Sequence, residues 1–272
     1  GYRGDSGTDG RLSRTRMLQL ADDVPHPQRG GRSPRASADS PTPPLHHSQT
    51  LRTGSARSVD RDITLLKGPR KREFFYLYVI IDLFSRYVVG WCVAMCESEE
   101  LAEHFIAQTC QRQEIGPDQL VLHADRGAVM RSKVVGELLS TLGVQRSHSR
   151  PRISNDNPMS ESQFKTLKYH STFPERFADL EDARQFCVRW FQWYNNEHHH
   201  VGLALLTPWQ VYSGGWEEVL SARQATLDAA YDARPDRFVR GRPKVGRPPS
   251  EVWINRPLES STSGVEGSRE PR

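Results

Sequence analysis

The chain has 272 residues, a hydrophobic content of 36% and a formal net charge of +4. This length suits one large domain, or one medium domain with extensions. No apolar run approaches the roughly 20 residues that a membrane-spanning helix needs, and no signal peptide is visible. We therefore expect a cytoplasmic protein without a membrane partner.

The modest net charge hides an uneven distribution. Residues 1–58 contain nine Arg and five Asp but no Lys or Glu, so the remaining residues carry 28 basic and 28 acidic side chains. A surface for nucleic acid in the folded part must therefore come from local clustering of cations, not from overall charge.

Residues 1–58 also lack the side chains that build a core. They contain no Phe, Trp or Ile, and six Pro fall between Pro25 and Pro44. Such a segment cannot bury enough apolar surface to offset the entropy of ordering, so we predict that it is disordered. Two origins stay open: a basic arm that touches DNA, or a stretch produced by a frameshift or a wrongly assigned start.

From Asp60 onward the composition changes to short runs of β-branched and aromatic residues alternating with helical patterns. Leu101, Ala102, Phe105, Ile106 and Thr109 recur at helical spacing after Ser98. The predicted strands are 63–66, 74–81, 87–95, 119–123 and 144–147, and the predicted helices are 101–109 and 134–142. Strands followed by alternating helix and strand indicate an α/β sandwich with a mixed sheet.

Three further helices are expected in the second half. Pro158 suits the first turn of one helix, with Asn157 as its N-cap. Residues 180–194 carry an apolar, aromatic stripe that we interpret as core packing. Residues 216–230 form the last predicted helix, which leads into a basic loop over 237–247.

Three acidic residues stand in settings that suit divalent-metal chemistry. Asp62 precedes the apolar stretch 74–81, and Asp125 follows the apolar run 120–123. Glu161 lies in the predicted third helix, with 35 residues between it and Asp125. Mg²⁺ prefers oxygen ligands. Two such ions about 3.5–4 Å apart activate the nucleophile and stabilise the leaving oxygen in phosphodiester chemistry.

These contexts carry a resemblance to a known family. Residues 60–257 resemble the catalytic protein, made from the second reading frame, of bacterial insertion-sequence transposases related to retroviral integrases. The stretches that carry the match are Asp62-Ile63-Thr64, residues 76–86, the Asp125 loop, residues 149–168 and Tyr194-Asn195-Asn196-Glu197-His198.

The resemblance implies a fold and a domain arrangement. The fold would be ribonuclease-H-like, with a mixed five-stranded sheet and flanking helices. An integrase catalytic core over 59–214 would lie between the arm, 1–58, and a helical, basic C-terminal extension, 215–272, that ends in a disordered tail.

The resemblance also implies an activity of the DDE type. The chain would be a transposase that cleaves DNA strands and transfers them during transposition, with Asp62, Asp125 and Glu161 as catalytic residues that bind two Mg²⁺ or Mn²⁺ ions and with Asp62 as the bridge. Expected partners are double-stranded DNA at the element ends and the target, further copies of the chain on DNA, and a helix-turn-helix protein from an upstream frame. In a bacterium it would associate with the nucleoid when bound to DNA.

Two departures from the family pattern keep an alternative open. Ser58-Val59-Asp60-Arg61 replaces the family's usual aromatic residues before the first Asp, and the N-terminal helical DNA-binding region is missing. An inactive or truncated remnant that binds DNA without autonomous transposition is the second hypothesis. A simple ribonuclease H would not explain the motifs at 154–168 and 194–198.

Candidate DNA contacts surround the predicted third helix. Lys165 and Lys168 follow Glu161 at i+4 and i+7, so they share one face. Arg146, Arg150 and Arg152 would flank that helix on a loop and neutralise phosphates. The alternative for the lysines is a solvated helix face, and the basic turn 70–72 stays open between DNA contact and a solubilising role.

Other polar residues are expected to have structural roles. Asp82 would begin a turn, Asp156 would precede a helix, and the four Cys, which lack paired CxxC spacing, would be reduced thiols. His198-His199-His200 is interpreted as a helix terminus with imidazoles facing solvent, because three adjacent side chains cannot share one helix face.

Overall fold

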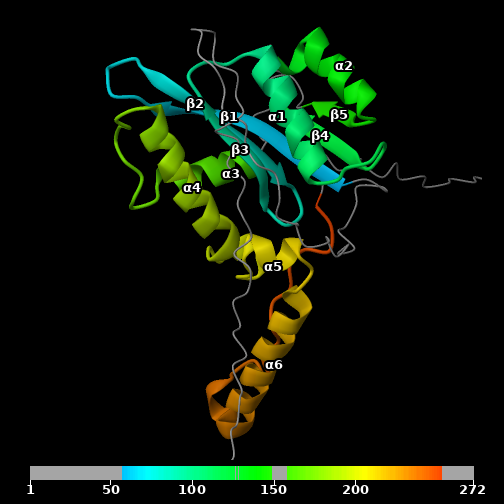
Figure 1. The fold of residues 1–272 in the computed structure, drawn as a ribbon. Coiled ribbons are helices and arrows are strands. Elements are labelled where there is room, and N and C mark those ends of the chain that lie inside the picture. Colours follow the sequence, from blue (N-terminus) through cyan, green and yellow to red (C-terminus); the bar gives the residue numbers. More distant parts are fainter. Residues whose placement is uncertain (1–56, 126, 128, 149–157, 253–272) are drawn as a thin grey trace, which may run out of the picture.

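The computed structural model describes residues 57–125, 127, 129–148 and 158–252, and its centre is a five-stranded mixed sheet (Figure 1). The strand order is β3-β2-β1-β4-β5. The strands are β1 (Arg57–Lys67), β2 (Phe74–Asp82), β3 (Val88–Ala94), β4 (Leu120–Ala124) and β5 (Gln145–His148). The predicted ribonuclease-H-like, mixed five-stranded architecture is confirmed.

The sheet is mixed because of how its strands are connected. β1, β2 and β3 follow one another through short turns and pair antiparallel. β4 lies parallel to β1, and β5 lies parallel to β4. Parallel neighbours need a crossover, and the helices α1 (Glu99–Arg112) and α2 (Lys133–Thr141) provide it.

Two layers of helices cover the two faces of the sheet (Figure 1). On one face, α1 and α2 pack on a cluster that includes Tyr78, Ile80 and Leu122. On the other, α3 (Pro158–Lys168) and α4 (Leu180–Asn196) pack on a cluster that includes Leu77 and Val79. The alternation of β2 side chains explains both cores, since successive residues of a strand point to opposite faces.

The aromatic stripe of α4 is core, as predicted. Trp190, Phe191 and Tyr194 are at most 3% exposed, and Phe191 stacks on Trp91 of β3 with ring centroids 5.1 Å apart. Asp179 caps the helix by accepting a hydrogen bond from the backbone N–H of Asp182. These contacts fix α4 across the sheet.

The first strand is longer than the sequence predicted. We expected strand 63–66, whereas β1 runs over Arg57–Lys67 and pairs with β2 on one side and β4 on the other. Pairing on both sides extends the strand through Asp60, Arg61 and Asp62, whose polar side chains do not favour a strand by themselves. Asp62 therefore lies within a central strand and not at its end.

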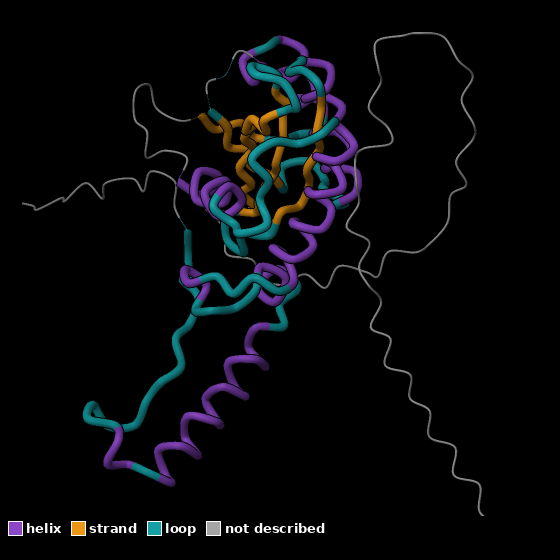
Figure 2. Tube along the Cα trace, turned by 90° about the vertical axis from the view of Figure 1, so that its left-hand side faces the viewer, coloured by secondary structure: helices purple, strands orange, loops and turns teal. Residues whose placement is uncertain are grey.

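An extension follows the core. After the short helices η4 (Val201–Leu203) and α5 (Pro208–Tyr212), the helix α6 (Trp216–Ala233) runs away from the sheet and is followed by η5 (Pro235–Arg237). Figures 1 and 2 show α6 projecting from the body of the molecule, with the chain after it returning beside the helix. A small cluster that includes Phe84, Leu203 and Leu220 joins its base to the core.

Some expectations fall outside this description. The predicted arm over 1–58 lies outside the described residues except for Arg57 and Ser58, as does the N-cap Asn157. All four cysteines are free, and three of them are buried. Among the described residues, no helix has the length and apolarity that crossing a membrane requires.

Candidate active site

The pairing of β1 with β4 places two of the three predicted carboxylates on neighbouring strands. Arg61 is the register partner of Ala124 in this parallel pair, so Asp62 and Asp125 each come one residue further along. Asp62 is partly buried, whereas Asp125 is exposed just beyond the end of β4. The Asp125 carboxylate accepts a hydrogen bond of 3.2 Å from the backbone N–H of Gly127.

The third carboxylate comes from a helix that is tied to β1. Glu161 is exposed in the first turn of α3, which begins at Pro158. The neighbouring Ser160 is 1% exposed, and its hydroxyl donates a hydrogen bond to the Asp60 carboxyl group on β1. This contact holds the N-terminal end of α3, and with it Glu161, against the strand that carries Asp62.

The pKa of Asp62 responds to the charges of the other two carboxylates. The pKa of Asp62 is raised to about 6, mainly because burial penalises its charged form, and the charges of Asp125 and Glu161 raise it further. A hydrogen bond from the backbone N–H of Ile63, 2.7 Å long, and the charge of Arg61 oppose this shift. Negative charge thus converges on Asp62 from a second strand and from a helix.

Carboxylate oxygens are the donor set that hard divalent cations prefer, and a cation placed there would offset the negative charge that Asp125 and Glu161 add to the effect of burial on Asp62. The described part of the chain, however, contains no group of three or more His, Cys, Asp or Glu side chains arranged closely enough to hold a metal ion. The residues fit a divalent ion in chemistry and in charge, and the three carboxylates would have to draw together around it.

Asp60 is a polar residue of this region that the sequence reasoning missed. It is fully buried, and burial, with smaller contributions from Asp62 and Asp125, raises its pKa to about 7, although the hydrogen bond from Ser160 lowers it. The signal was the alternation of β1. Had the strand been extended to Arg57, Asp60, Asp62 and Thr64 would have been placed on one face.

The predicted DNA-contacting cations have different surroundings. Lys165 is exposed, whereas the ammonium group of Lys168 donates a hydrogen bond of 2.6 Å to the hydroxyl of Thr64 on β1. Partial burial lowers the Lys168 pKa, and the charge of Asp62 opposes this shift.

Of the three predicted arginines, Arg146 is the one that lies within the described residues. Arg146 lies on β5 and not on a loop, and its guanidinium comes close to Gly136 of α2, on the face of the sheet away from α3. Strand pairing with β4 orients it that way. Arg150 and Arg152 lie outside the described residues.

Of the two aspartates expected to be structural, Asp82 lies within the described residues. Asp82 is fully buried, and one carboxylate oxygen accepts hydrogen bonds from the backbone of Phe84 and from the backbone and hydroxyl of Ser85, so it shapes the turn after β2. Asp156 lies outside the described residues.

The histidine tract follows the end of α4 as predicted, and His199 is exposed, but the other two imidazoles do not face solvent fully. His198 and His200 are partly buried, since the His198 ring stacks on Tyr194 and the His200 ring accepts a hydrogen bond from the backbone N–H of Gly202. Burial, Arg86 and His198 lower the His200 pKa to about 4. The chain turns sharply after α4, which brings these rings back onto the protein.

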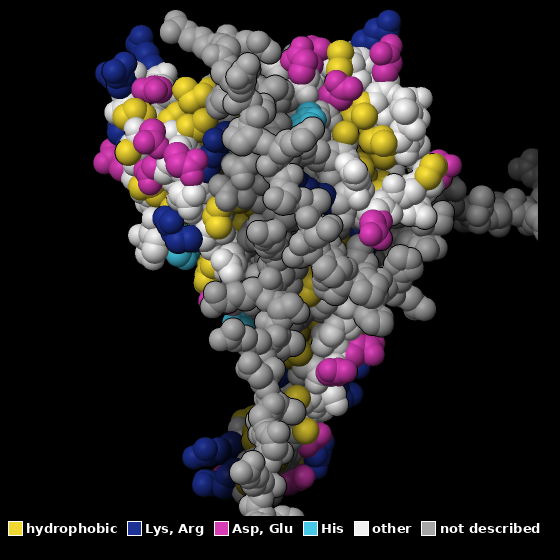
Figure 3. All heavy atoms as spheres, viewed as in Figure 1, with side chains coloured by type: hydrophobic (Ala, Val, Ile, Leu, Met, Phe, Trp, Pro, Cys, Tyr) yellow, Lys and Arg dark blue, Asp and Glu magenta, His cyan; other side chains and the backbone are white. Residues whose placement is uncertain are grey.

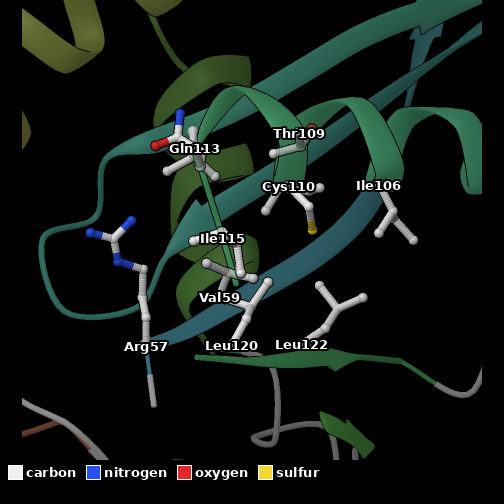
Figure 4. Close-up of a pocket in the computed structure, with 11 residues that line it drawn as sticks. Arg57, Val59, Ile106, Thr109, Cys110, Gln113, Ile115, Leu120 and Leu122 are labelled. Carbon is white, nitrogen blue, oxygen red and sulfur yellow. The ribbon is translucent and has the colours of Figure 1, made fainter. Parts of the chain in front are cut away.

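A pocket between β1, β4 and α1 is not part of this site. Figure 4 shows it lined by apolar side chains that include Val59, Ile106 and Leu122. None of the three carboxylates lines it, and Arg57 and Gln113 are the long polar side chains in its wall. Its lining is typical of an imperfectly filled core and not of a substrate site.

Comparison with known proteins identifies the class. Two family models, both described as "Integrase core domain", match residues 54–154 and 142–208. The transposase for insertion sequence element IS904 of Lactococcus lactis subsp. lactis (strain IL1403) is 33% identical over 141 residues, which are 52% of this chain and 55% of that protein. The putative transposase InsK for insertion sequence element IS150 of Escherichia coli (strain K12) is 26% identical over 49% of this chain and 47% of that protein.

Among solved structures, the HTLV-2 integrase catalytic core domain in complex with magnesium (dimeric form) matches 58% of this chain and 96% of that chain, with 15% identity and a TM-score of 0.42. The architecture of this chain is a mixed five-stranded sheet between two helical layers, with carboxylates on β1, after β4 and on α3. The chain belongs to the integrase core domain family, and the relatives named above are insertion-sequence transposases. It spans about half the length of those relatives.

Proposed function

We propose that this protein catalyses metal-dependent DNA strand cleavage and strand transfer during transposition. The observation that supports the proposal is that the negative charges of Asp125 and Glu161 act on the Asp62 carboxylate. The three residues come from three separate segments of a region that integrase core models match. Carboxylates converge in this way at the cost of mutual repulsion, and a bound cation would offset that cost.

Asp62, Asp125 and Glu161 are the residues that would hold the metal. Two Mg²⁺ or Mn²⁺ ions would activate the attacking oxygen and stabilise the leaving oxygen of the phosphodiester. Asp62, partly buried and central, is proposed to contact both ions. The hydrogen bond between Ser160 and Asp60 joins α3 to β1 and so positions the neighbouring Glu161.

The lysines of α3 are proposed to position DNA. Lys165 is exposed on the same helix face as Glu161, and its ammonium group can approach a phosphate without displacing another contact. Lys168 donates a hydrogen bond to Thr64 and is influenced by the charge of Asp62. It would therefore offset negative charge where a phosphate approaches the carboxylates. Arg150 and Arg152 stay candidates for the same role. Arg146 is a weaker candidate because its guanidinium lies close to α2.

The proposed partners follow from the activity. They are duplex DNA at the element ends and at the target, further copies of this chain assembled on that DNA, and a helix-turn-helix protein from an upstream frame. The alternative function is a DNA-binding remnant without catalysis, and its ground is the departure of Ser58-Val59-Asp60-Arg61 from the family pattern.

The test is joining of a pre-cut DNA end into plasmid. The wild-type chain is expected to join ends with Mg²⁺ or Mn²⁺ and not with a chelator. Asp62→Asn, Asp125→Asn and Glu161→Gln are each expected to reduce joining by several orders of magnitude, because each dismantles the metal geometry. Asp118→Asn and Glu175→Gln remove exposed carboxylates elsewhere and should retain activity. Wild-type protein that binds DNA but does not join it would support the remnant instead.

A further inference from the structure

The extension is a defined structure and not a loose tail. After α6 the chain turns through η5 and runs back beside the helix, as Figure 2 shows. The side-chain amide of Gln224 on α6 makes two hydrogen bonds to the backbone of the returning segment. It donates to the carbonyl of Pro243 at 3.1 Å and accepts from the N–H of Val245 at 2.8 Å.

Arg242 fastens the same segment further out. Its guanidinium donates to the carboxylates of Asp228 and Asp232 at 2.9 and 2.5 Å and lies 4.9 Å from the centroid of the Tyr231 ring. Gly241, with φ of +78°, supplies the turn that directs Arg242 back to the helix. The residues just before it, 234–241, therefore form a loop at the free end of the extension.

The returning segment carries more basic than acidic side chains. Residues 234–247 contain six Lys or Arg and one Asp. Arg242 is neutralised by α6, and Arg234 pairs with Asp236. Within the described residues no acidic partner is recorded for the other four cations, all exposed: Arg237, Arg240, Lys244 and Arg247. Figure 3 shows Lys and Arg side chains gathered at the free end of the extension.

The surface is cationic but almost without exposed apolar area. Within residues 216–252, Val239 is the one large hydrophobic side chain that is strongly exposed, at 98%, and it lies between Arg237 and Arg240. A stable protein partner typically needs about 800 Å² of contact on each side, with an apolar centre. Unpaired cations around one small apolar side chain instead suit a polyanion, where each cation that meets a phosphate releases a counterion.

We propose that the end of the extension, residues 237–247, is a second DNA-binding surface that contacts the phosphates of duplex DNA at a distance from the carboxylates. Arg237 and Arg240 make the outermost contacts, Lys244 and Arg247 follow along the returning segment, and Arg242 keeps that segment on α6. This rests on the proposed function in that the ligand is the DNA on which the core acts. It would let the core hold a reacting end while the extension binds the same duplex further along, or a second duplex.

The test is a salt series of equilibrium titrations with fluorescent duplex DNA, in chelator so that no cleavage occurs. The double variant Arg237→Gln/Arg240→Gln is compared with wild type and with Arg131→Gln/Lys133→Gln, which removes the same charge from an exposed site beside α2. Two lost phosphate contacts should reduce the slope of log affinity against log salt by about 2, and should weaken binding roughly tenfold to hundredfold at 0.1 M salt. The control should retain the wild-type slope.

Lys244→Gln/Arg247→Gln provides an independent second variant, and circular dichroism melting verifies the fold of each. Wild-type slopes in both extension variants, or an equal loss in the control, would overturn the proposal. The outcome is separable from that of the joining assay. Wild-type joining together with unchanged slopes removes only this surface, whereas wild-type protein that binds no duplex DNA contradicts the proposed function as well.

Discussion

One hydroxyl group joins the helix that carries Glu161 to the strand that carries Asp62. Ser160 donates to the carboxyl group of Asp60, whose other oxygen has no hydrogen-bond partner in the described structure. A buried acceptor that loses its partner costs more than the bond itself contributes, because the group has already been removed from water.

Ser160→Ala should therefore reduce the free energy of unfolding by about 1–3 kcal/mol, measured by urea denaturation. Ser162→Ala on the exposed side of the same helix is the matched control and should change it by less than about 0.5 kcal/mol. Equal effects of the two substitutions would show that the contact with Asp60 does not stabilise α3.

His200 gives the fold a dependence on pH. Its pKa is lowered to about 4 by burial and by Arg86 and His198, and its ring must stay neutral to accept from the backbone N–H of Gly202. Between the unfolded value of about 6.5 and pH 4 the unfolded chain takes up a proton that the folded chain does not. Stability from this group is therefore present above about pH 6.5 and is lost as pH falls toward 4.

His200→Asn keeps an N-cap acceptor but removes the titration. The difference in unfolding free energy between variant and wild type should shift in favour of the variant as pH falls from 7 to 4. A difference that stays constant across this range would contradict the assignment.

Val59 borders a small space in the core. It is 3% exposed and lines the pocket of Figure 4. Val59→Ile should fill part of the pocket and raise the free energy of unfolding by about 0.8 kcal/mol for the added methylene. Val93→Ile, at a fully buried position outside the pocket, should instead destabilise by overpacking. A loss of stability in both would mean that the pocket has no usable volume.

At the scale of elements, local pattern predicted most of the fold. The runs 74–81 and 119–123 became β2 and β4, and the apolar spacing near Ser98 became α1 with that serine as N-cap. The outer part of β1 was missed because pairing on both sides, a property of the tertiary structure, outweighed the low strand propensity of Asp60 and Asp62.

Part of the candidate site could likewise be predicted from the sequence, and part depends on tertiary packing. Motif context selected Asp62, Asp125 and Glu161, and the structure couples their charges. The contact of Lys168 with Thr64 and the orientation of Arg146 toward α2 depend on how helices and strands pack, which spacing along one helix cannot reveal. Asp60 would have been found only with the full length of β1.

Arg242 makes several of the contacts that keep the returning segment on α6. Arg242→Gln removes two carboxylate contacts and the contact with Tyr231, so the segment 235–247 should separate from α6 while the core stays folded. Hydrogen exchange of peptides from this segment should become several-fold faster, with no change in peptides from β1 or α4. Arg234→Gln, which removes only a pair within the turn, should leave exchange of residues 242–247 unchanged. Unaltered exchange in Arg242→Gln would show that other contacts hold the segment.

At the scale of the molecule, the three candidate carboxylates lie on the core, and the extension adds a second group of exposed cations. The core contributes carboxylates from β1, from the end of β4 and from α3, while the described residues after α6 contribute exposed arginines and lysines (Figures 1 and 3). This arrangement gives an elongated molecule two places to meet a long polyanion.

The central claim is that Asp62, Asp125 and Glu161 bind divalent metal together. It is tested most directly by titrating Mn²⁺ against the full chain with a pre-cut DNA end present, following free Mn²⁺ by electron paramagnetic resonance. Wild type should bind two ions, as two-metal phosphodiester chemistry requires. Asp62→Asn, Asp125→Asn and Glu161→Gln should each lose at least one while their circular dichroism is unchanged, and Asp118→Asn and Glu175→Gln should keep both. Wild-type protein that binds no Mn²⁺, or folded triad variants that bind as many ions as wild type, would contradict the account.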